Sequence, residues 1–298
     1  LRNLDYTYLG EHEKMMITDG ENVIAGGRNF GDVYLADDKW TDFDLSFTGP
    51  IANEALHLFQ EKWNQQVDVQ MQIDLGKTPR KVFEKYTSHA ILTDIQQVED
   101  QKIAIITHKP SDNFSEPSNI LMTMLHGIRK AKSSLRVANA YLVEFPALTK
   151  ELLDAARRGV QVDIVTNSNE SIDEPIISMP ILKTVANLYI EGQKLGENKD
   201  KLKIFLKKGN WKTLHTKLMI VDSDTLISSS YNLHPRSEKI EAEMAVIVQD
   251  NRVASRAIQE FSQYIQNESS LVQSVDDTNL ANTNILFIFM GRLMHDLI

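Results

Sequence analysis

The chain has 298 residues, enough for one large domain or two of ordinary size, and its 42% hydrophobic and 24% charged residues exclude a disordered polypeptide. Its formal net charge of −9 gives no general attraction for phosphate polymers, so a nucleic-acid role needs a local basic patch. The absence of cysteine excludes disulfides and thiolate metal sites. The most apolar stretch, "ILFIFM" at 285–290, is much shorter than the roughly 18 apolar residues of a membrane span.

The first predicted element is a strand within "HEKMMITD", residues 12–19. On a strand, residues two apart point to the same face, so His12 and Lys14 are expected to project together. Asp19 lies beyond the apolar body of the strand and is expected to have a structural role, in a turn or at the sheet end. Gly27 and Asn29 follow in "AGGRN", where small residues let the backbone approach a ligand closely.

Next in the chain, "WTDFDLSFTGP" at 40–50 alternates polar and apolar residues as a half-buried strand does, and it carries Asp42 and Asp44. Residues 68–117 are rich in Gln, Lys, Asp and Ser, which indicates a strand-containing connection.

From residue 118 onward, helical and strand patterns alternate. Helices are predicted within 118–135, from Pro146 to Gly159, and around 180–195, with strands at 135–143, 160–165 and 201–208. This order predicts a mixed or parallel sheet with helices on both faces. An amphipathic helix is predicted at 250–266.

The strand "HTKLMIVD", residues 215–222, repeats the first motif. Without a gap, His12 aligns with His215, Lys14 with Lys217, Asp19 with Asp222, Gly27 with Ser230, and Asn29 with Asn232. Chance predicts only about 0.04 such His–Lys–Asp patterns in a chain of this composition. The two motifs therefore come from an internal duplication.

Two imidazoles, two ammonium groups and two amides together suit a phosphoryl centre. Lysines and amides stabilise the non-bridging oxygens, one imidazole attacks phosphorus, and the other protonates the leaving alkoxide. Each imidazole needs an acid that fixes its tautomer. The candidates are Asp42 and Asp44 after the first motif, and Glu241 and Glu243 in "EKIEAEMAVIV" after the second.

The paired motifs resemble the phospholipase D superfamily, whose signature is H-x-K-x4-D followed by G-(G/S)-x-N, present twice. "GGRNFGDVYL" and "YNLHPRSEKIEAEMAVIV" look closest to bacterial cardiolipin synthases and related phospholipases D. The resemblance extends over most of the chain from Glu11 onward. It has two departures: Ser229 stands where glycine is usual, and His234 where aspartate is usual.

The resemblance implies roles for the site residues. Asp42 and Glu243 match the acids that orient the histidines, with Asp44 in reserve. His12 matches the nucleophile and His215 the general acid of a reaction that passes through a phosphohistidine. Gly27, Asn29, Ser230 and Asn232 are expected to bind the substrate phosphate. No metal ion and no cofactor is expected.

The duplication and the resemblance together predict an α/β fold of two similar halves. Each half is expected to be a mixed sheet flanked by helices, and a pseudo-two-fold axis places the site between the halves. We expect an incomplete first half with its connection at 1–110, and a second half with a helical C-terminal tail at 111–298. Because only 11 residues precede His12, several strands and helices of the first half are expected to be absent from this chain.

The expected function is phosphatidyl transfer of the cardiolipin synthase type, or hydrolysis of the phospholipase D type. The partners are a phospholipid and an acceptor, either an alcohol or water, with peripheral contact to a bacterial envelope membrane; secretion is the alternative location. A nuclease of the same superfamily is a second hypothesis, although nucleic acid fits poorly with the net charge of −9. An inactive scaffold is the third hypothesis.

Overall fold

The computed structural model describes residues 10–35, 40–66, 89–91, 102–110, 117–143, 145–209 and 212–280. The apolar stretch 285–290 and most of the predicted connection at 68–117 lie outside these residues. Within the described ranges, no helix has both the length and the apolar character that a membrane crossing requires.

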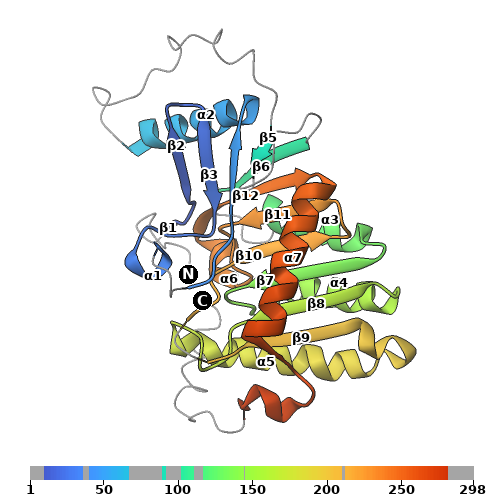
Figure 1. Cartoon of the computed structure of the whole chain (residues 1–298). Helices are drawn as coiled ribbons and strands as arrows, with labels where there is room; N and C mark the ends of the chain where they lie inside the picture. The colour runs from blue at the N-terminus through green and yellow to red at the C-terminus, as the bar shows by residue number, and fades with distance from the viewer. Residues whose placement is uncertain are drawn as a thin grey trace.

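A nine-stranded mixed sheet forms the centre of the molecule (Figure 1). Its strands are β1 (Gly10–Glu11), β6 (Lys102–His108), β7 (Ser134–Asn139), β8 (Gln161–Thr166), β9 (Leu202–Lys207), β10 (Lys217–Val221), β11 (Thr225–Ser229), β12 (Glu241–Gln249) and β13 (Ser269–Leu271). β7, β8 and β9 are parallel, as the strand–helix alternation predicts, whereas β10, β11 and β12 are antiparallel neighbours. β6 joins this sheet by pairing with β12.

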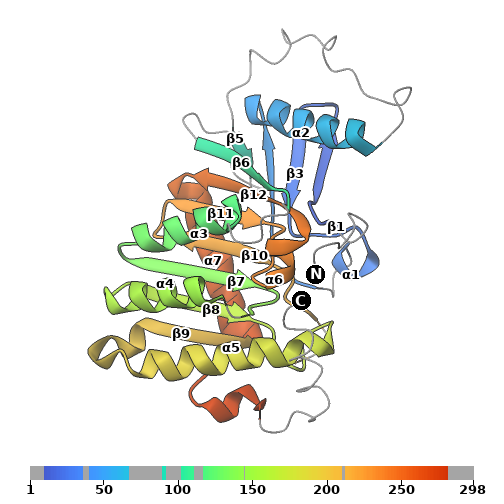
Figure 2. The same cartoon turned by 180° about the vertical axis from the view of Figure 1, so that it is seen from behind.

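Helices cover both faces of the large sheet, as Figures 1 and 2 show from opposite sides. One face carries α3 (Asn119–Lys130), α4 (Pro146–Arg157) and α5 (Pro175–Gln193), and the other carries α7 (Asn251–Glu268). Strand residues therefore alternate between two cores: Met219 packs with α3, while Leu218 and Ile220 pack with α7. Shorter helical segments are α6 (Pro235–Lys239) and the 3₁₀ turns Gly196–Lys201 and Val275–Thr278.

A smaller sheet comes from the first half of the chain and shares the α7-side core. It contains β2 (Met15–Thr18), β3 (Asn22–Gly26), β4 (Asp44–Thr48) and β5 (His89–Ile91), accompanied by α1 (Asp32–Leu35) and α2 (Pro50–Gln66). All its strand pairs are antiparallel, which differs from the mixed sheet predicted for each half. The parallel strands β7–β9 have no counterparts among the described residues of the first half.

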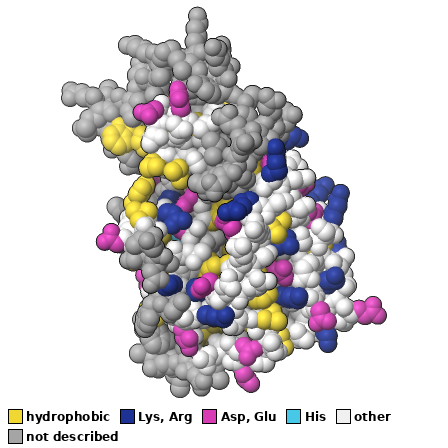
Figure 3. Space-filling model, viewed as in Figure 1, with side chains coloured by type: hydrophobic (Ala, Val, Ile, Leu, Met, Phe, Trp, Pro, Cys, Tyr) yellow, Lys and Arg dark blue, Asp and Glu magenta, His cyan; other side chains and the backbone are white. Residues whose placement is uncertain are grey.

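The duplication is visible side chain by side chain in the two sheets. Met16 lies opposite Ile24, just as Met219 lies opposite Ile227 at the equivalent register. The second pair is 2% exposed in the core that includes α3, whereas Met16 is 38% and Ile24 41% exposed. Hydrophobic side chains are accordingly visible on the surface of this part of the molecule (Figure 3). The sheet of the first half therefore exposes a face whose equivalent in the second half is buried.

The motif aspartates end equivalent hairpins in the same conformation. Asp19 and Asp222 adopt left-handed backbone angles, with φ of 55° and 52°. The carboxylate of Asp222 accepts hydrogen bonds from the backbone N–H groups of Lys132, Ser133 and Ser134 and from the Ser133 hydroxyl. Asp222 therefore fixes the start of β7. Asp19 is exposed, and the described residues contain no loop equivalent to 132–134 beside it.

This difference predicts unequal costs of substitution. Asp222→Ala is expected to lower the free energy of unfolding by about 1–2 kcal/mol, as the loss of a helix cap does, because it leaves three backbone donors without their acceptor. Asp19→Ala, the matched control, should change it by no more than about 0.5 kcal/mol. Urea denaturation of both variants measures the difference, and equal losses would contradict the assignment.

Candidate active site

Backbone pairing between the two halves places each motif histidine beside the other half's acid-bearing segment. β1 runs parallel to β12 with Glu11 opposite Ala242, and the His12 N–H donates to the Ala242 carbonyl at 2.9 Å. In the same way, Thr41 bridges to Leu214 in parallel, and the His215 N–H donates to the Thr41 carbonyl at 2.7 Å. Both histidines lie just before their motif strands, which begin at Met15 and Lys217. The same crossed arrangement thus occurs twice.

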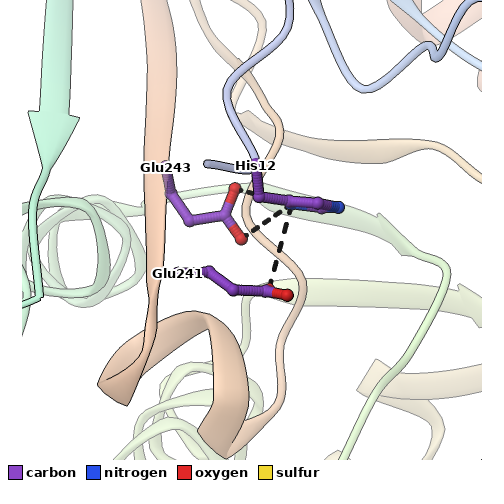
Figure 4. Close-up of side chains that lie close together, drawn as sticks. All are labelled: His12, Glu241 and Glu243. Atoms are coloured by element: carbon purple, nitrogen blue, oxygen red, sulfur yellow. Dashed lines mark hydrogen bonds and ion pairs between the residues drawn. The ribbon is translucent and has the colours of Figure 1, made fainter. Parts of the chain in front are cut away.

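The first crossed pair joins His12 to Glu243 (Figure 4). Nδ1 of His12 is 3.0 Å from both carboxylate oxygens of Glu243, which is fully buried. Burial alone would raise the pKa of Glu243, but hydrogen bonds from His12 and Ser230 outweigh it and the pKa is lowered. Glu243 is therefore ionised at neutral pH and stabilises positive charge on the His12 ring.

The second crossed pair joins His215 to Asp42, with Nδ1 of His215 2.7 Å from Oδ2 of Asp42. Burial raises the pKa of Asp42 to about 6, although the nearby Lys217 ammonium works in the opposite direction. Burial and Lys217 together lower the pKa of His215 to about 2, so its imidazole is neutral in the free site. Asp44, the reserve candidate, instead pairs with Arg28, whose Nε is 2.5 Å from Oδ2 of Asp44.

Both lysines lie against their own histidines. Nζ of Lys14 donates to the His12 carbonyl and Nζ of Lys217 to the His215 carbonyl, each at 2.6 Å. Burial lowers the pKa of each lysine to about 8. Charges of one motif act on the other: after burial and Lys217, the positive charge of Lys14 also lowers the pKa of His215. The charge of the first motif therefore acts on the histidine of the second.

These pKa values predict a bell-shaped pH dependence of kcat/KM for the free protein. Activity should rise through about pH 6 as Asp42 ionises and can stabilise positive charge on His215, and it should fall above about pH 8 as Lys14 and Lys217 lose their protons. Asp42→Asn should remove the acid limb while leaving the alkaline limb in place. Initial rates measured across this range at constant ionic strength test the assignment. An acid limb unchanged in Asp42→Asn would contradict it.

The residues predicted to bind phosphate have different surroundings. The Asn29 amide donates to the hydroxyl of Tyr34 at 3.0 Å. Asn232 is 2% exposed, and its amide oxygen has no hydrogen-bond partner in the described part of the chain. The Ser230 hydroxyl donates to Glu243 and its backbone N–H to the Met244 carbonyl, so Ser230 supports the acid of the first crossed pair.

Gly27 lies where the two halves meet. A Cβ added at Gly27 would be 2.7 Å from Oδ1 of Asp42 and 3.1 Å from Cδ of Lys217. This close approach explains why a small residue is needed at this point of the first motif.

Sequence reasoning missed several residues of the site. The rings of Tyr34 and Trp40 lie against His215, with centroid distances of 5.0 and 6.0 Å. His234, which stands where aspartate is usual, is buried and caps α6 by accepting the Ser237 N–H on Nδ1 at 3.2 Å. Burial lowers the pKa of His234 to about 3, which keeps the ring neutral and able to accept. The Pro235 that follows it was the available signal for a helix start.

His12, Glu241 and Glu243 also have the side-chain types that hold cations, with ligand atoms within 4.8 Å of one another. Their oxygens already have protein partners. Glu241 pairs with Arg236 at 2.7 Å and accepts from Ser237 at 3.0 Å, and Glu243 binds His12. A metal ion would have to displace these donors, so the group fits an orienting network better than a metal centre.

The chain is similar to several known proteins. The family model described as "Cardiolipin synthase, PLD-like domain" matches residues 124–265. The chain is 25% identical over 294 residues to an uncharacterised Helicobacter pylori protein, covering 88% of this chain and 58% of that protein. It is 23% identical over 267 residues to a cardiolipin synthase of Staphylococcus aureus, covering 88% of this chain and 48% of that enzyme. The chain thus spans about half the length of these relatives.

Among solved structures, a phosphatidylserine synthase of Haemophilus influenzae superposes with a TM-score of 0.69 at 14% identity. The match covers 100% of this chain and 73% of that structure, and it shows a common fold.

Proposed function

Because this chain belongs to the phospholipase D superfamily, we propose that it acts on the phosphodiester of a phospholipid, by phosphatidyl transfer or by hydrolysis. One observation carries the proposal: each motif histidine is hydrogen-bonded through Nδ1 to a buried carboxylate of the other half. A ring bound in this way presents Nε2 to a substrate, and the carboxylate stabilises the charge that develops on it.

In the first step of the proposed reaction, Nε2 of His12 bonds to phosphorus and the bond to the head-group oxygen breaks. The His12 ring becomes cationic, and ionised Glu243 stabilises it through Nδ1–H. His215 supplies the proton that the leaving alkoxide takes up. In this proposal Lys14, Lys217 and the amides of the two motif asparagines stabilise the non-bridging oxygens.

The neutral state of His215 in the free site means that it must gain a proton before it can act as an acid. The negative charge of a bound phosphodiester raises the pKa of a neighbouring imidazole, and the ionised carboxylate of Asp42 acts in the same direction. In the second step His215 removes a proton from water or an acceptor alcohol, which then attacks phosphorus and releases His12. The neutral form is the one that this second step requires.

We propose that the protein contacts a bacterial envelope membrane peripherally, because a phospholipid substrate lies there and the relatives named above are bacterial. The chemistry assigned to its side chains needs no metal ion.

The test is incubation with mixed micelles of phosphatidylethanolamine or phosphatidylglycerol, followed by mass spectrometry of the lipids. Phosphatidic acid, cardiolipin or head-group-exchanged lipid is the expected product, and Lys14→Met/Lys217→Met is the inactive control. Parallel incubations contain single- and double-stranded DNA. Salt-sensitive DNA cleavage without lipid turnover would contradict the proposal and favour the nuclease hypothesis. No reaction with either substrate would favour the inactive-scaffold hypothesis.

A further inference from the structure

Arg28 lies within the first motif, and its side chain binds three separate points of the segment that follows. Nε is 2.5 Å from Oδ2 of Asp44, and the backbone N–H of Arg28 donates to Oδ1 of the same carboxylate at 3.2 Å. Nη1 donates to the Tyr34 carbonyl at 2.9 Å, and Nη2 donates to the Asp42 carbonyl at 3.1 Å. Each of the three guanidinium nitrogens therefore has its own oxygen acceptor, on α1, just before β4 and at the start of β4.

The segment that Arg28 holds carries side chains that contact His215. Tyr34 meets the imidazole edge-on with a centroid distance of 5.0 Å, and the Trp40 ring lies 6.0 Å away. Oδ2 of Asp42 is 2.7 Å from Nδ1 of the same imidazole. Arg28 binds the backbone at Tyr34 and at Asp42, so it fixes the positions of two of these three side chains.

The layout of these bonds requires an arginine. Lysine could form a pair with Asp44 equally well, and such a pair contributes little where the basic side chain is 30% exposed, as that of Arg28 is. A planar guanidinium instead donates in fixed directions to several acceptors at once, which the single ammonium group of lysine does not reproduce. Burial raises the pKa of Asp42, and the positive charge of Arg28 is one of several that act against this rise. Arg28 therefore acts on Asp42 through geometry as well as charge.

We propose that Arg28 is a positioning residue that keeps the acid Asp42 and its neighbouring aromatic ring in place against His215. This inference rests on the proposed function, in which His215 protonates the head-group oxygen. His12 is oriented by Glu243 on β12 and not by the segment that Arg28 holds. A change at Arg28 should therefore impair proton transfer to the leaving group and spare the attack on phosphorus.

The experiment compares two head groups in Arg28→Lys, which keeps the positive charge but loses the fork. Release of ethanolamine from phosphatidylethanolamine, whose alkoxide has to be protonated as it leaves, should slow by about 10- to 100-fold, less than the complete loss of a general acid. Release of p-nitrophenol from a p-nitrophenyl phospholipid needs no proton and should stay close to the wild-type rate. Single-turnover measurements with excess protein give a rate constant for each lipid, and the ratio of the two does not depend on the fraction of folded protein.

Chemical rescue of Arg28→Ala provides a second test. The side chain that this variant lacks is partly open to solvent, so added guanidinium, below its denaturing range, can donate to the same oxygens. Ethanolamine release by Arg28→Ala should rise with guanidinium but not with tetramethylammonium, which has the same charge and no N–H donors. Equal restoration by the two ions would show that charge alone matters and would overturn the role of the fork.

Arg252→Lys is the matched control, because Arg252 also pairs with an aspartate, Asp250, at 2.9 Å but lies on α7, and both rate constants should stay unchanged. Asp44→Asn keeps an oxygen acceptor for Nε of Arg28, so it should leave the ratio of the two rate constants unchanged. Equal losses for the two lipids in Arg28→Lys, or no loss with either, would overturn the positioning role while leaving phospholipid turnover intact. Release of neither alcohol by the wild-type protein would contradict the proposed function itself and the positioning role with it.

Discussion

Replacing His12 with alanine is expected to lower phospholipid turnover by about 10²- to 10⁴-fold, or about 3–5 kcal/mol of transition-state stabilisation. Without this ring no covalent bond to phosphorus forms. The loss should therefore be equally large for a phospholipid whose head group is p-nitrophenol, an alcohol that leaves without a proton.

His215→Ala should lower turnover of natural lipids by a similar factor, because the alkoxide then leaves unprotonated. With the p-nitrophenyl lipid, however, release of the first p-nitrophenol should be largely preserved. The matched control is His126→Ala, an exposed histidine on α3, which should leave both rates unchanged. Pre-steady-state release of p-nitrophenol separates the cases. A burst in His12→Ala and none in His215→Ala would reverse the two roles.

Replacing the orienting acids should reproduce these effects crosswise. Glu243→Gln is expected to resemble His12→Ala, and Asp42→Asn to resemble His215→Ala, each with a loss of about 10²- to 10⁴-fold. The amides keep the shape of the carboxylates but cannot stabilise an imidazolium. The p-nitrophenyl lipid distinguishes crossed pairing from pairing within each half. If the acids acted within their own halves, Asp42→Asn would instead resemble His12→Ala.

Double variants test independently that each histidine acts with the acid of the other half. His12→Ala combined with Glu243→Gln should be little worse than His12→Ala alone, because the acid acts through that ring. The control acid is Asp44, two residues after Asp42, whose carboxylate holds Arg28 rather than a histidine. Asp44→Asn should cost less than about tenfold and should show no dependence on the leaving group.

The residue types of the candidate site could be predicted from sequence because the duplication repeats them at fixed offsets. The alternation after residue 118 also correctly predicted the parallel strands β7–β9 and their helices. The crossing of acids could not be predicted. It depends on pairing between segments 173 and 231 positions apart, such as Asp42 with His215 and His12 with Glu243, and local periodicity contains no information about such pairing.

Individual substitutions also required the structure. His234 stands where aspartate is usual, yet it still caps the N-terminus of α6. Its neutral imidazole nitrogen accepts a backbone N–H, as a carboxylate oxygen would. Asp19 and Asp222 look equivalent in sequence and share a backbone conformation. In the described structure, however, only Asp222 has a neighbouring loop whose backbone N–H groups donate to its carboxylate. The sequence patterns around Tyr34 and Trp40 do not indicate which distant residue these rings contact, so their contact with His215 had no signal in the sequence.

The central claim is that two imidazoles from different halves act on one phosphorus atom, and covalent trapping tests it most directly. His215→Ala lacks the base for the second step, so rapid quenching with the p-nitrophenyl lipid and peptide mass spectrometry at alkaline pH should find the phosphatidyl group on His12. No adduct should form in His12→Ala. An adduct on another side chain, or turnover with no adduct at His12 in any variant, would contradict the account.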